Sequence, residues 1–85
     1  MYEIELRRNA IKALDKIPKT ARSRIASSLL RLSENPRPGG VEKVRGTELW
    51  RVRQGDYRLV YHINDENKKI TVVRIGHRRD IYQGL

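Results

Sequence analysis

The sequence predicts an α+β fold in which an N-terminal strand and a helical hairpin precede a three-stranded antiparallel meander, forming one small sheet in the order β-α-α-β-β-β. Two observations predict this class. Apolar residues recur at helical spacing through residues 8–34, and apolar and polar residues alternate through much of residues 48–75. The chain has 85 residues, which suits a small core, so we expect residues 1–85 to form a single domain.

The first half of the chain predicts one strand and two helices. Tyr2–Leu6 alternates enough for a strand, and Arg8–Ile17 is amphipathic, with Asn9 as its candidate N-cap. Pro18 suits the first turn of a second helix, which Asn35-Pro36 ends. The apolar positions expected to face the core are Ala10, Ile11, Leu14, Ile17, Ala21, Ile25, Leu29 and Leu32.

The second half predicts three strands, at Glu48–Arg53, Tyr57–Ile63 and Lys69–Ile75. Gly55 can adopt positive φ in the first connecting turn, and polar residues 64–67 form the second. Gly76 is expected to end the last strand, and Arg79–Gln83 to form at most one helical turn. The helical hairpin would then cover one face of the sheet and leave the other face open.

The composition points to an anionic partner. The formal net charge is +9, from 19 basic and 10 acidic residues, which favours nucleic acid, an acidic protein or an anionic membrane surface. The chain has no cysteine, and two histidines alone rarely bind a metal. No window approaches the roughly 20 apolar residues of a membrane span, and the N-terminus lacks a signal-peptide pattern. We therefore expect a cytoplasmic protein that needs no metal or cofactor.

Three arginines are expected on one face of the predicted sheet. Side chains alternate along a strand, so Arg51 and Arg53 face one way while Trp50 and Val52 face the core. Arg58 on the next strand shares the face of the first two. Guanidinium groups gathered in this way repel one another unless an anion lies among them, and they suit bidentate binding of phosphate. Ordinary exposed strand residues would give the same pattern, but a structural sheet needs only its apolar face. We therefore favour a phosphate site. The remaining strand aromatics, Tyr57 and Tyr61, are expected in the core.

Four segments carry a further pattern: Lys43-Val44-Arg45-Gly46, Trp50-Arg51-Val52-Arg53, Tyr57-Arg58-Leu59-Val60-Tyr61 and Gly76-His77-Arg78-Arg79-Asp80-Ile81-Tyr82. Together they resemble the RelE/ParE superfamily of type II toxin–antitoxin systems, on the RelE side. The resemblance extends over nearly the whole chain. Its specific part is the combination of the last two segments, because short apolar-basic strands are common.

This resemblance implies a RelE-like fold and a ribosome-dependent endoribonuclease (an mRNA interferase) that inhibits translation, in a stress response, by cutting mRNA in the ribosomal A site. In that chemistry the RNA 2′-hydroxyl attacks the adjacent phosphate, without a metal or cofactor. The implied partners are the ribosome, mRNA and a cognate RelB-like antitoxin. We expect the antitoxin to be acidic and partly disordered, and to cover or displace the Arg78–Tyr82 end.

The resemblance also implies site residues. Arg51 and Arg53 fall on two basic strand positions of the family, Arg58 on the arginine of its Tyr-Arg-Leu motif, Arg78 on the basic residue after the strand-ending Gly, and Tyr82 on its C-terminal tyrosine. Arg58 and Arg78 would hold the phosphate, with Arg78 donating to the leaving oxygen, and Tyr82 would stack on a base or orient the 2′-hydroxyl. Further RNA contacts are expected from Lys43, Arg45, Arg74 and Arg79. For Arg74, covering the sheet edge is an equally good explanation.

The identity of the general base is open. RelE-type enzymes commonly carry lysines where this chain has Arg51 and Arg53, and arginine stays protonated at neutral pH. Either Arg53 acts only electrostatically, or a histidine takes the proton. His77 is the first choice because it adjoins Arg78, and His62 is the second.

Two other functions fit parts of this pattern. One is a ParE-like toxin that poisons a topoisomerase, although that branch lacks such an arginine and tyrosine set. The other is a non-catalytic RNA- or ribosome-binding module, which the arginines alone would satisfy. A fold shared by these classes cannot separate them, because function resides in the site.

Overall fold

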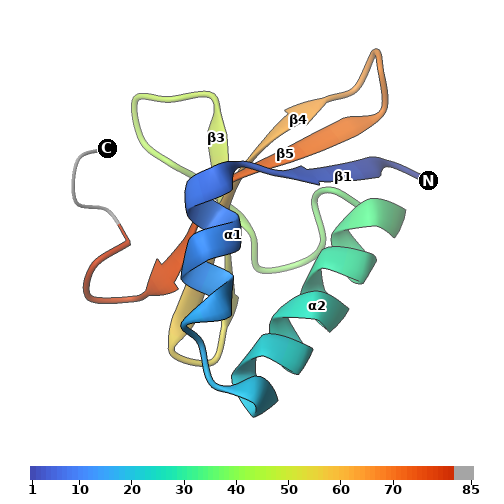
Figure 1. Ribbon diagram of the computed structural model, residues 1–85. Coiled ribbons are helices and arrows are strands. Elements are labelled where there is room, and N and C mark those ends of the chain that lie inside the picture. The colour runs from blue at the N-terminus through green and yellow to red at the C-terminus, as the bar shows by residue number, and fades with distance from the viewer. Residues whose placement is uncertain (82–85) are drawn as a thin grey trace.

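The computed structural model describes residues 1–81 of the chain. Within that range the chain forms two helices and five strands (Figure 1). In chain order they are β1 (Glu3–Leu6), α1 (Arg8–Asp15), α2 (Lys19–Glu34), β2 (Glu42–Lys43), β3 (Leu49–Gln54), β4 (Tyr57–Asn64) and β5 (Lys69–His77). The predicted α+β class and element order are confirmed. Strand β2 is an addition, because two residues are too few to show an alternating pattern.

The five strands form one sheet in the order β1-β5-β4-β3-β2. Strand β1 is parallel to β5, and the other neighbours are antiparallel, so β3, β4 and β5 make the predicted meander. Strand β5 contains a bulge: Val60 pairs with Arg74, but Tyr61 pairs with Val72, which leaves Val73 as an extra residue. The bulge reverses which face each later residue of β5 occupies.

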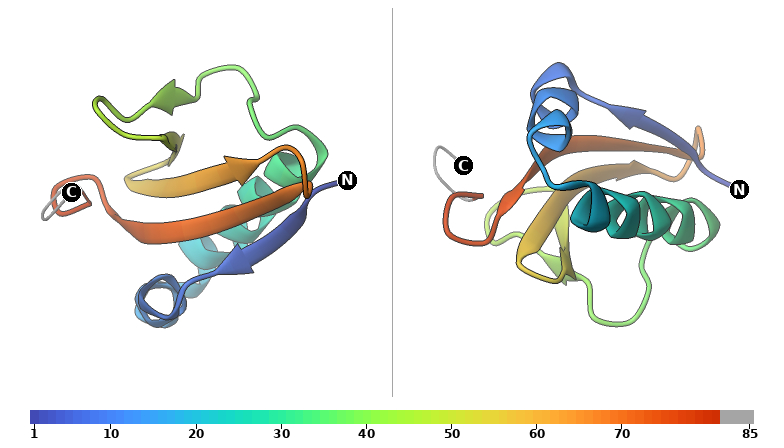
Figure 2. Two further views of the ribbon diagram at one scale, coloured as in Figure 1. Left: turned by 90° about the horizontal axis from the view of Figure 1, so that it is seen from above. Right: turned by 60° about the horizontal axis from the view of Figure 1, so that its bottom comes forward.

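The main core lies between the helices and one face of the sheet (Figure 2). Its buried members are Ala10, Ile17, Ile25, Leu32, Leu59, Tyr61, Ile63, Ile70, Val72 and Ile75. Helix α1 follows β1 after one connecting residue, Arg7, and contacts β5, the neighbour of β1 in the sheet. The Arg7 amide donates to the Val72 carbonyl at 3.0 Å, and Asn9 Nδ2 donates to the Val73 carbonyl at 2.9 Å. Neither helix in residues 1–81 is long and apolar enough to cross a membrane.

Several details of the predicted elements were wrong. The N-cap of α1 is Arg7, without a side-chain hydrogen bond, because the Asn9 amide is used by the bulge in β5. Ile11 is 49% exposed, so it does not belong to the buried stripe of α1. Strand β5 continues past Gly76 to His77, because Gly76 still pairs with Arg58 on β4.

The sequence had predicted that the second face of the sheet is open, and this prediction is wrong because part of the face is covered. Val44, Val60 and Ile81 form a small separate cluster on this face, with Leu49 and Val73 packed against it. Val60 is fully buried and Ile81 is 1% exposed. The covering residues come from the end of β2 and from the turn after β5, two short segments whose packing leaves no periodic signal. The residues of the β3–β4 turn do not belong to this cluster, so the covering of this face is partial.

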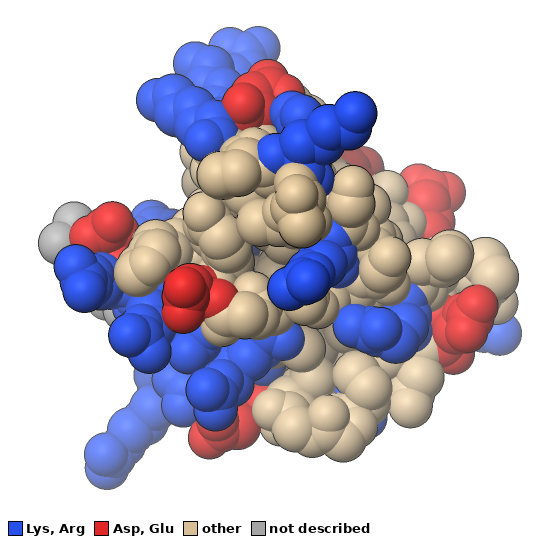
Figure 3. All heavy atoms as spheres, turned by 90° about the horizontal axis from the view of Figure 1, so that it is seen from below, with Lys and Arg blue, Asp and Glu red and all other residues tan. Residues whose placement is uncertain are grey.

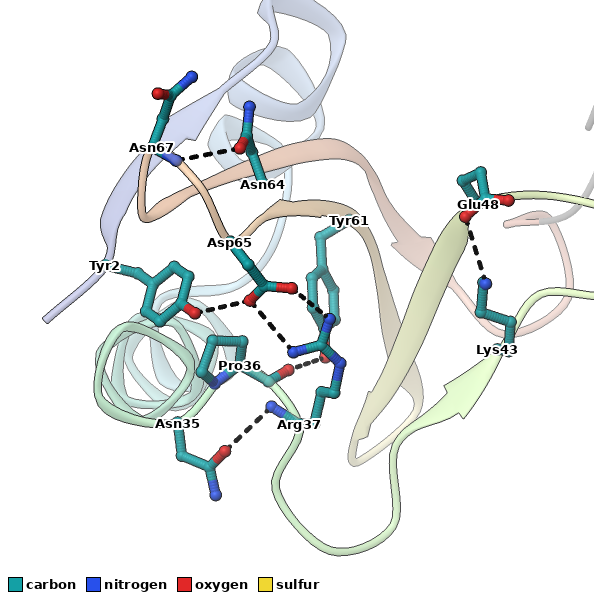
Figure 4. Close-up of polar contacts among 10 residues, drawn as sticks. All are labelled: Tyr2, Asn35, Pro36, Arg37, Lys43, Glu48, Tyr61, Asn64, Asp65 and Asn67. Atoms are coloured by element: carbon teal, nitrogen blue, oxygen red, sulfur yellow. Dashed lines mark hydrogen bonds and ion pairs between the residues drawn. The ribbon is translucent and has the colours of Figure 1, made fainter.

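A polar network joins three segments at the corner formed by the start of β1, the end of α2 and the β4–β5 turn (Figure 4). The Tyr2 hydroxyl donates to Asp65 Oδ1 at 2.6 Å, and Arg37 donates to both Asp65 oxygens, at 3.3 and 2.9 Å. The hydrogen bonds from Arg37 and Tyr2 lower the pKa of Asp65. Beside this network, the buried Tyr61 hydroxyl donates to the Pro36 carbonyl at 2.7 Å, and burial raises the pKa of Tyr61 to about 12.

We expect Asp65→Asn to destabilise the protein at neutral pH, and to do so less as the pH falls. A carboxyl whose folded-state pKa is lowered stabilises the fold above its ordinary value of 3.8 and loses that effect as the pH falls through the lowered value. Urea unfolding at neutral pH and below pH 3.8 measures the difference from wild type. Glu66→Gln, in the same exposed turn, makes the same charge change and is the matched control. An equal loss in both variants, or a loss independent of pH, would contradict the role given to Asp65.

Candidate functional site

The three arginines singled out on β3 and β4 do share one face of the sheet. Arg53 pairs directly with Arg58 across the two strands, and Arg51 pairs with the buried Val60. Residues paired in this way point to the same side. Like charges placed directly opposite each other destabilise a sheet. The Arg53–Arg58 pair is therefore the feature of this face that a purely structural sheet would avoid.

These arginines line a shallow depression of about 270 Å³, together with Gly40 and Glu42. Glu42 comes from the edge strand β2, where it pairs with Arg51, and its Oε2 lies 3.3 Å from Arg51 Nη2. The depression thus holds a carboxylate beside three guanidinium groups. Sequence analysis missed Glu42, because only the register between β2 and β3 brings it to this face.

The hairpin turn fixes Arg58. Its Nη1 donates to the Gly55 carbonyl at 3.0 Å and to the Tyr57 carbonyl at 2.9 Å. Gly55 has a φ of 60°, a backbone conformation that residues other than glycine rarely adopt, and this conformation allows the tight turn between β3 and β4. Arg58 is therefore held at the rim of the depression, while Arg53 beside it is exposed. An anion entering the depression would meet the anchored guanidinium of Arg58 beside the exposed guanidinium of Arg53.

Arg78 directly follows β5 and is not among the residues that line the depression. Its amide donates to the Asp56 carbonyl in the β3–β4 turn at 2.8 Å, which ties the backbone at Arg78 to the turn between Arg53 and Arg58. The side chain of Arg78 is exposed. Tyr82, the other residue expected from this end of the chain, lies outside the described residues.

His77 lies on the other face of the sheet from the arginines. It pairs with Tyr57, and the two rings make an edge contact with centroids 5.9 Å apart. Its Nδ1 accepts a hydrogen bond from the Arg79 amide at 3.2 Å. The bulge at Val73 causes this placement, because unbroken alternation from Val72 would put His77 with the arginines. His62 does share the arginine face, but it lies four residues from Arg58, roughly 13 Å along the strand.

The further cations expected to contact RNA are dispersed. Lys43 pairs with Trp50 on the core-side face, where its Nζ lies 5.3 Å from the Trp50 ring and 3.5 Å from Glu48 Oε2. Arg45 and Arg79 are exposed. Arg74 shares the arginine face through its pairing with Val60, and its Nη1 donates to the Ile81 carbonyl at 3.1 Å.

The strand aromatics belong to the core, as predicted. Tyr61 is fully buried, and Trp50 and Tyr57 are partly buried against the main core. Trp50 also carries Arg37 over its ring, 5.2 Å from the centroid. Figure 3 shows Lys and Arg side chains over much of one face of the molecule, with uncharged residues and some acidic side chains between them. Among residues 1–81, no group of three or more His, Asp or Glu side chains could hold a metal ion.

Comparisons with known proteins place this geometry in a family. A family described as "ParE toxin of type II toxin-antitoxin system, parDE" matches residues 4–82. A RelE-like toxin protein of Escherichia coli is 31% identical over 86 residues, which cover 95% of this chain and 90% of that protein.

Solved structures agree with the sequence matches. The RelE–RelB complex of Pyrococcus horikoshii contains a chain that superposes with a TM-score of 0.83 at 30% identity, covering 93% of this chain and 97% of that one. The Escherichia coli RelBE complex gives a TM-score of 0.79 at 29% identity, covering 91% and 96%. The chain therefore belongs to the RelE/ParE superfamily of type II toxin–antitoxin toxins, on its RelE-like branch.

Proposed function

We propose that this toxin is a ribosome-dependent endoribonuclease that cleaves mRNA in the A site and thereby inhibits translation. The convergence of Arg51, Arg53 and Arg58 on one depression carries the proposal, because such a cluster is costly to a fold and suited to phosphate. The substrate's own 2′-hydroxyl would attack the adjacent phosphate, so the protein need supply only charge, proton transfer and position. The ribosome would hold the mRNA in line for attack.

The arginines would stabilise the charge that develops on the phosphate. Arg58, anchored by two backbone carbonyls, is already oriented before the RNA arrives, and fixed donors of this kind stabilise a transition state most effectively. Exposed Arg53 would close onto the second oxygen. Arg78 would donate to the leaving 5′-oxygen, since its backbone is tied to the same hairpin turn.

Glu42 is the best-placed proton acceptor among the described residues of the depression. Its carboxylate lines the same space as the three arginines, and the ion pair with Arg51 orients it. In the proposed step, Glu42 accepts the 2′-hydroxyl proton as the 2′-oxygen bonds to phosphorus and the bond from phosphorus to the 5′-oxygen breaks. This leaves a 2′,3′-cyclic phosphate, and the departing 5′-oxygen, hydrogen-bonded by Arg78, takes a proton from water to become a 5′-hydroxyl. Arginine cannot take this proton readily, and His77 faces the other side of the sheet.

We also propose a RelB-like antitoxin as the protein partner, because solved chains that superpose closely on this one come from RelE–RelB complexes. A net charge of +9 suits an acidic partner. Burial of Ile81 makes the end of the described chain costly to displace, so covering this end is favoured over moving it.

The matching family description names ParE, which favours topoisomerase poisoning as the second candidate. Primer extension on mRNA from a translating extract separates the candidates. Discrete cuts within codons support the proposal. Intact mRNA with accumulating broken DNA supports the ParE-like alternative, and stalled ribosomes without cuts support a non-catalytic binding module.

We expect Arg58→Ala and Arg78→Ala to reduce the rate of mRNA cleavage by roughly 10²–10³-fold, because each removes a donor to the reacting phosphate. Circular dichroism and thermal unfolding verify that each variant is folded. Lys12→Ala removes an exposed cation from α1 and should leave cleavage unchanged. Wild-type cleavage by either folded arginine variant would remove that arginine from the site.

Glu42→Gln should reduce cleavage by roughly 100-fold while binding to mRNA-loaded ribosomes persists, because the amide fills the same space but accepts no proton. His77→Gln, on the opposite face, is the comparison and should cleave at a rate near wild type. Normal cleavage by Glu42→Gln together with an inactive Arg53→Ala would instead assign the step to Arg53 electrostatics.

Antitoxin binding should protect backbone amides of the helices and of residues 76–81 from hydrogen exchange. Increasing salt should weaken antitoxin binding less than RNA binding, since the apolar contacts expected between two proteins are not screened by salt. Absence of protection at both places would refute this docking.

A further inference from the structure

We propose that Arg74 is a positioning residue, which holds the turn that carries Arg78 rather than binding RNA phosphate. The inference rests on the proposed function, in that Arg78 is the residue being positioned. It concerns the segment between the end of β5 and Ile81.

This segment forms a closed turn. The amides of Asp80 and Ile81 both donate to the His77 carbonyl, at 2.9 and 3.1 Å, and the Arg79 amide donates to His77 Nδ1. At the start of the turn, the Arg78 amide is bound to Asp56. Four backbone donors in succession are therefore used within residues 78–81, and His77 serves as the hub of the turn.

Ile81 anchors the far end of the turn on the arginine face. It is 1% exposed and packs against Val44 and Val60. Gly76 lies beneath it: a Cβ built on Gly76 would lie 3.3 Å from Ile81 Cδ1. The absence of a side chain at Gly76 thus lets Ile81 approach the sheet closely.

Arg74 completes the anchor through a hydrogen bond from its guanidinium to the Ile81 carbonyl, at 3.1 Å. The bulge at Val73 is what turns Arg74 toward this face, opposite Val60. Arg74 is half-buried, and it is not among the residues that line the depression holding Arg51, Arg53 and Arg58. The turn is consequently held at one end by the bond from Arg78 to the β3–β4 hairpin and at the other end by Arg74 and Ile81.

The competing explanation is that Arg74 binds phosphate directly. Arg74 lines a second surface depression, of about 370 Å³, with Arg7, Asn9, Leu49 and Val73, which RNA would have to reach. The two explanations differ in their salt dependence. Losing a phosphate contact lowers the slope of log affinity against log salt by about 0.7 for single-stranded RNA, whereas losing a positioning contact leaves that slope unchanged.

The test compares Arg74→Met with Arg53→Met, which removes an exposed guanidinium from the proposed phosphate site. Arg74→Met should lower kcat roughly 10- to 100-fold with little change in KM, as a misplaced group does. Its salt slope for binding mRNA-loaded ribosomes should match wild type, while that of Arg53→Met should fall. Hydrogen exchange at the Ile81 amide should accelerate in Arg74→Met and in Ile81→Ala, and stay unchanged in Arg53→Met.

A reduced salt slope in Arg74→Met, or unchanged Ile81 exchange in that variant, would overturn the proposal. Should Arg74→Met fail to fold, Arg74→Lys serves instead, because it keeps the charge but lacks the planar fork, and it should show the same exchange and kcat changes. The exchange and salt measurements need no cleavage. Failure of wild type to cut mRNA would therefore count against the proposed function alone.

Discussion

Strand β4 is the constraint on which the rest of the structure depends, because it is buried on both faces. Leu59, Tyr61 and Ile63 face the helices, while Val60 on the other side is covered by Val44 and Ile81. A strand in the middle of the sheet with both faces covered fixes the register of its neighbours, since a slip by one residue would exchange every inward and outward side chain. The positions of Arg53 and Gly76 opposite Arg58 follow from that register.

The arginines on the face of Val60 destabilise the sheet, because their like charges repel. Arg53 and Arg58 stand directly opposite each other, and the structure moderates their repulsion in two ways. Arg58 is drawn back onto the carbonyls of Gly55 and Tyr57, and Glu42 supplies a negative charge beside Arg51. Neither arrangement places a carboxylate on Arg53 itself. The remaining unfavourable charge density is what an anionic ligand would relieve, so the energetic defect of the fold and its proposed function are located in the same residues.

The sequence was sufficient for features that depend on strict alternation or helical spacing. These include the α+β class, the meander, the shared face of the three arginines and the core positions of Trp50, Tyr57 and Tyr61. It was insufficient where one residue of irregularity decides the outcome. Strand β2 has two residues, yet it brings Glu42 into the depression. The bulge at Val73 exchanges His77 for Arg74 on the arginine face, and no periodic signal marks its position.

That single bulge links the mechanism to the architecture. Had β5 kept its alternation, a histidine adjacent to Arg78 would have faced the depression, and Arg74 would have pointed into the apolar core. With the bulge, the imidazole instead organises the turn after β5, and the guanidinium closes it. In the proposed reaction, proton transfer would then fall to another group on the arginine face, and edge strand β2 supplies the carboxylate of Glu42 there. With arginines at both strand positions, the proposed reaction would thus divide charge stabilisation and proton acceptance between different strands.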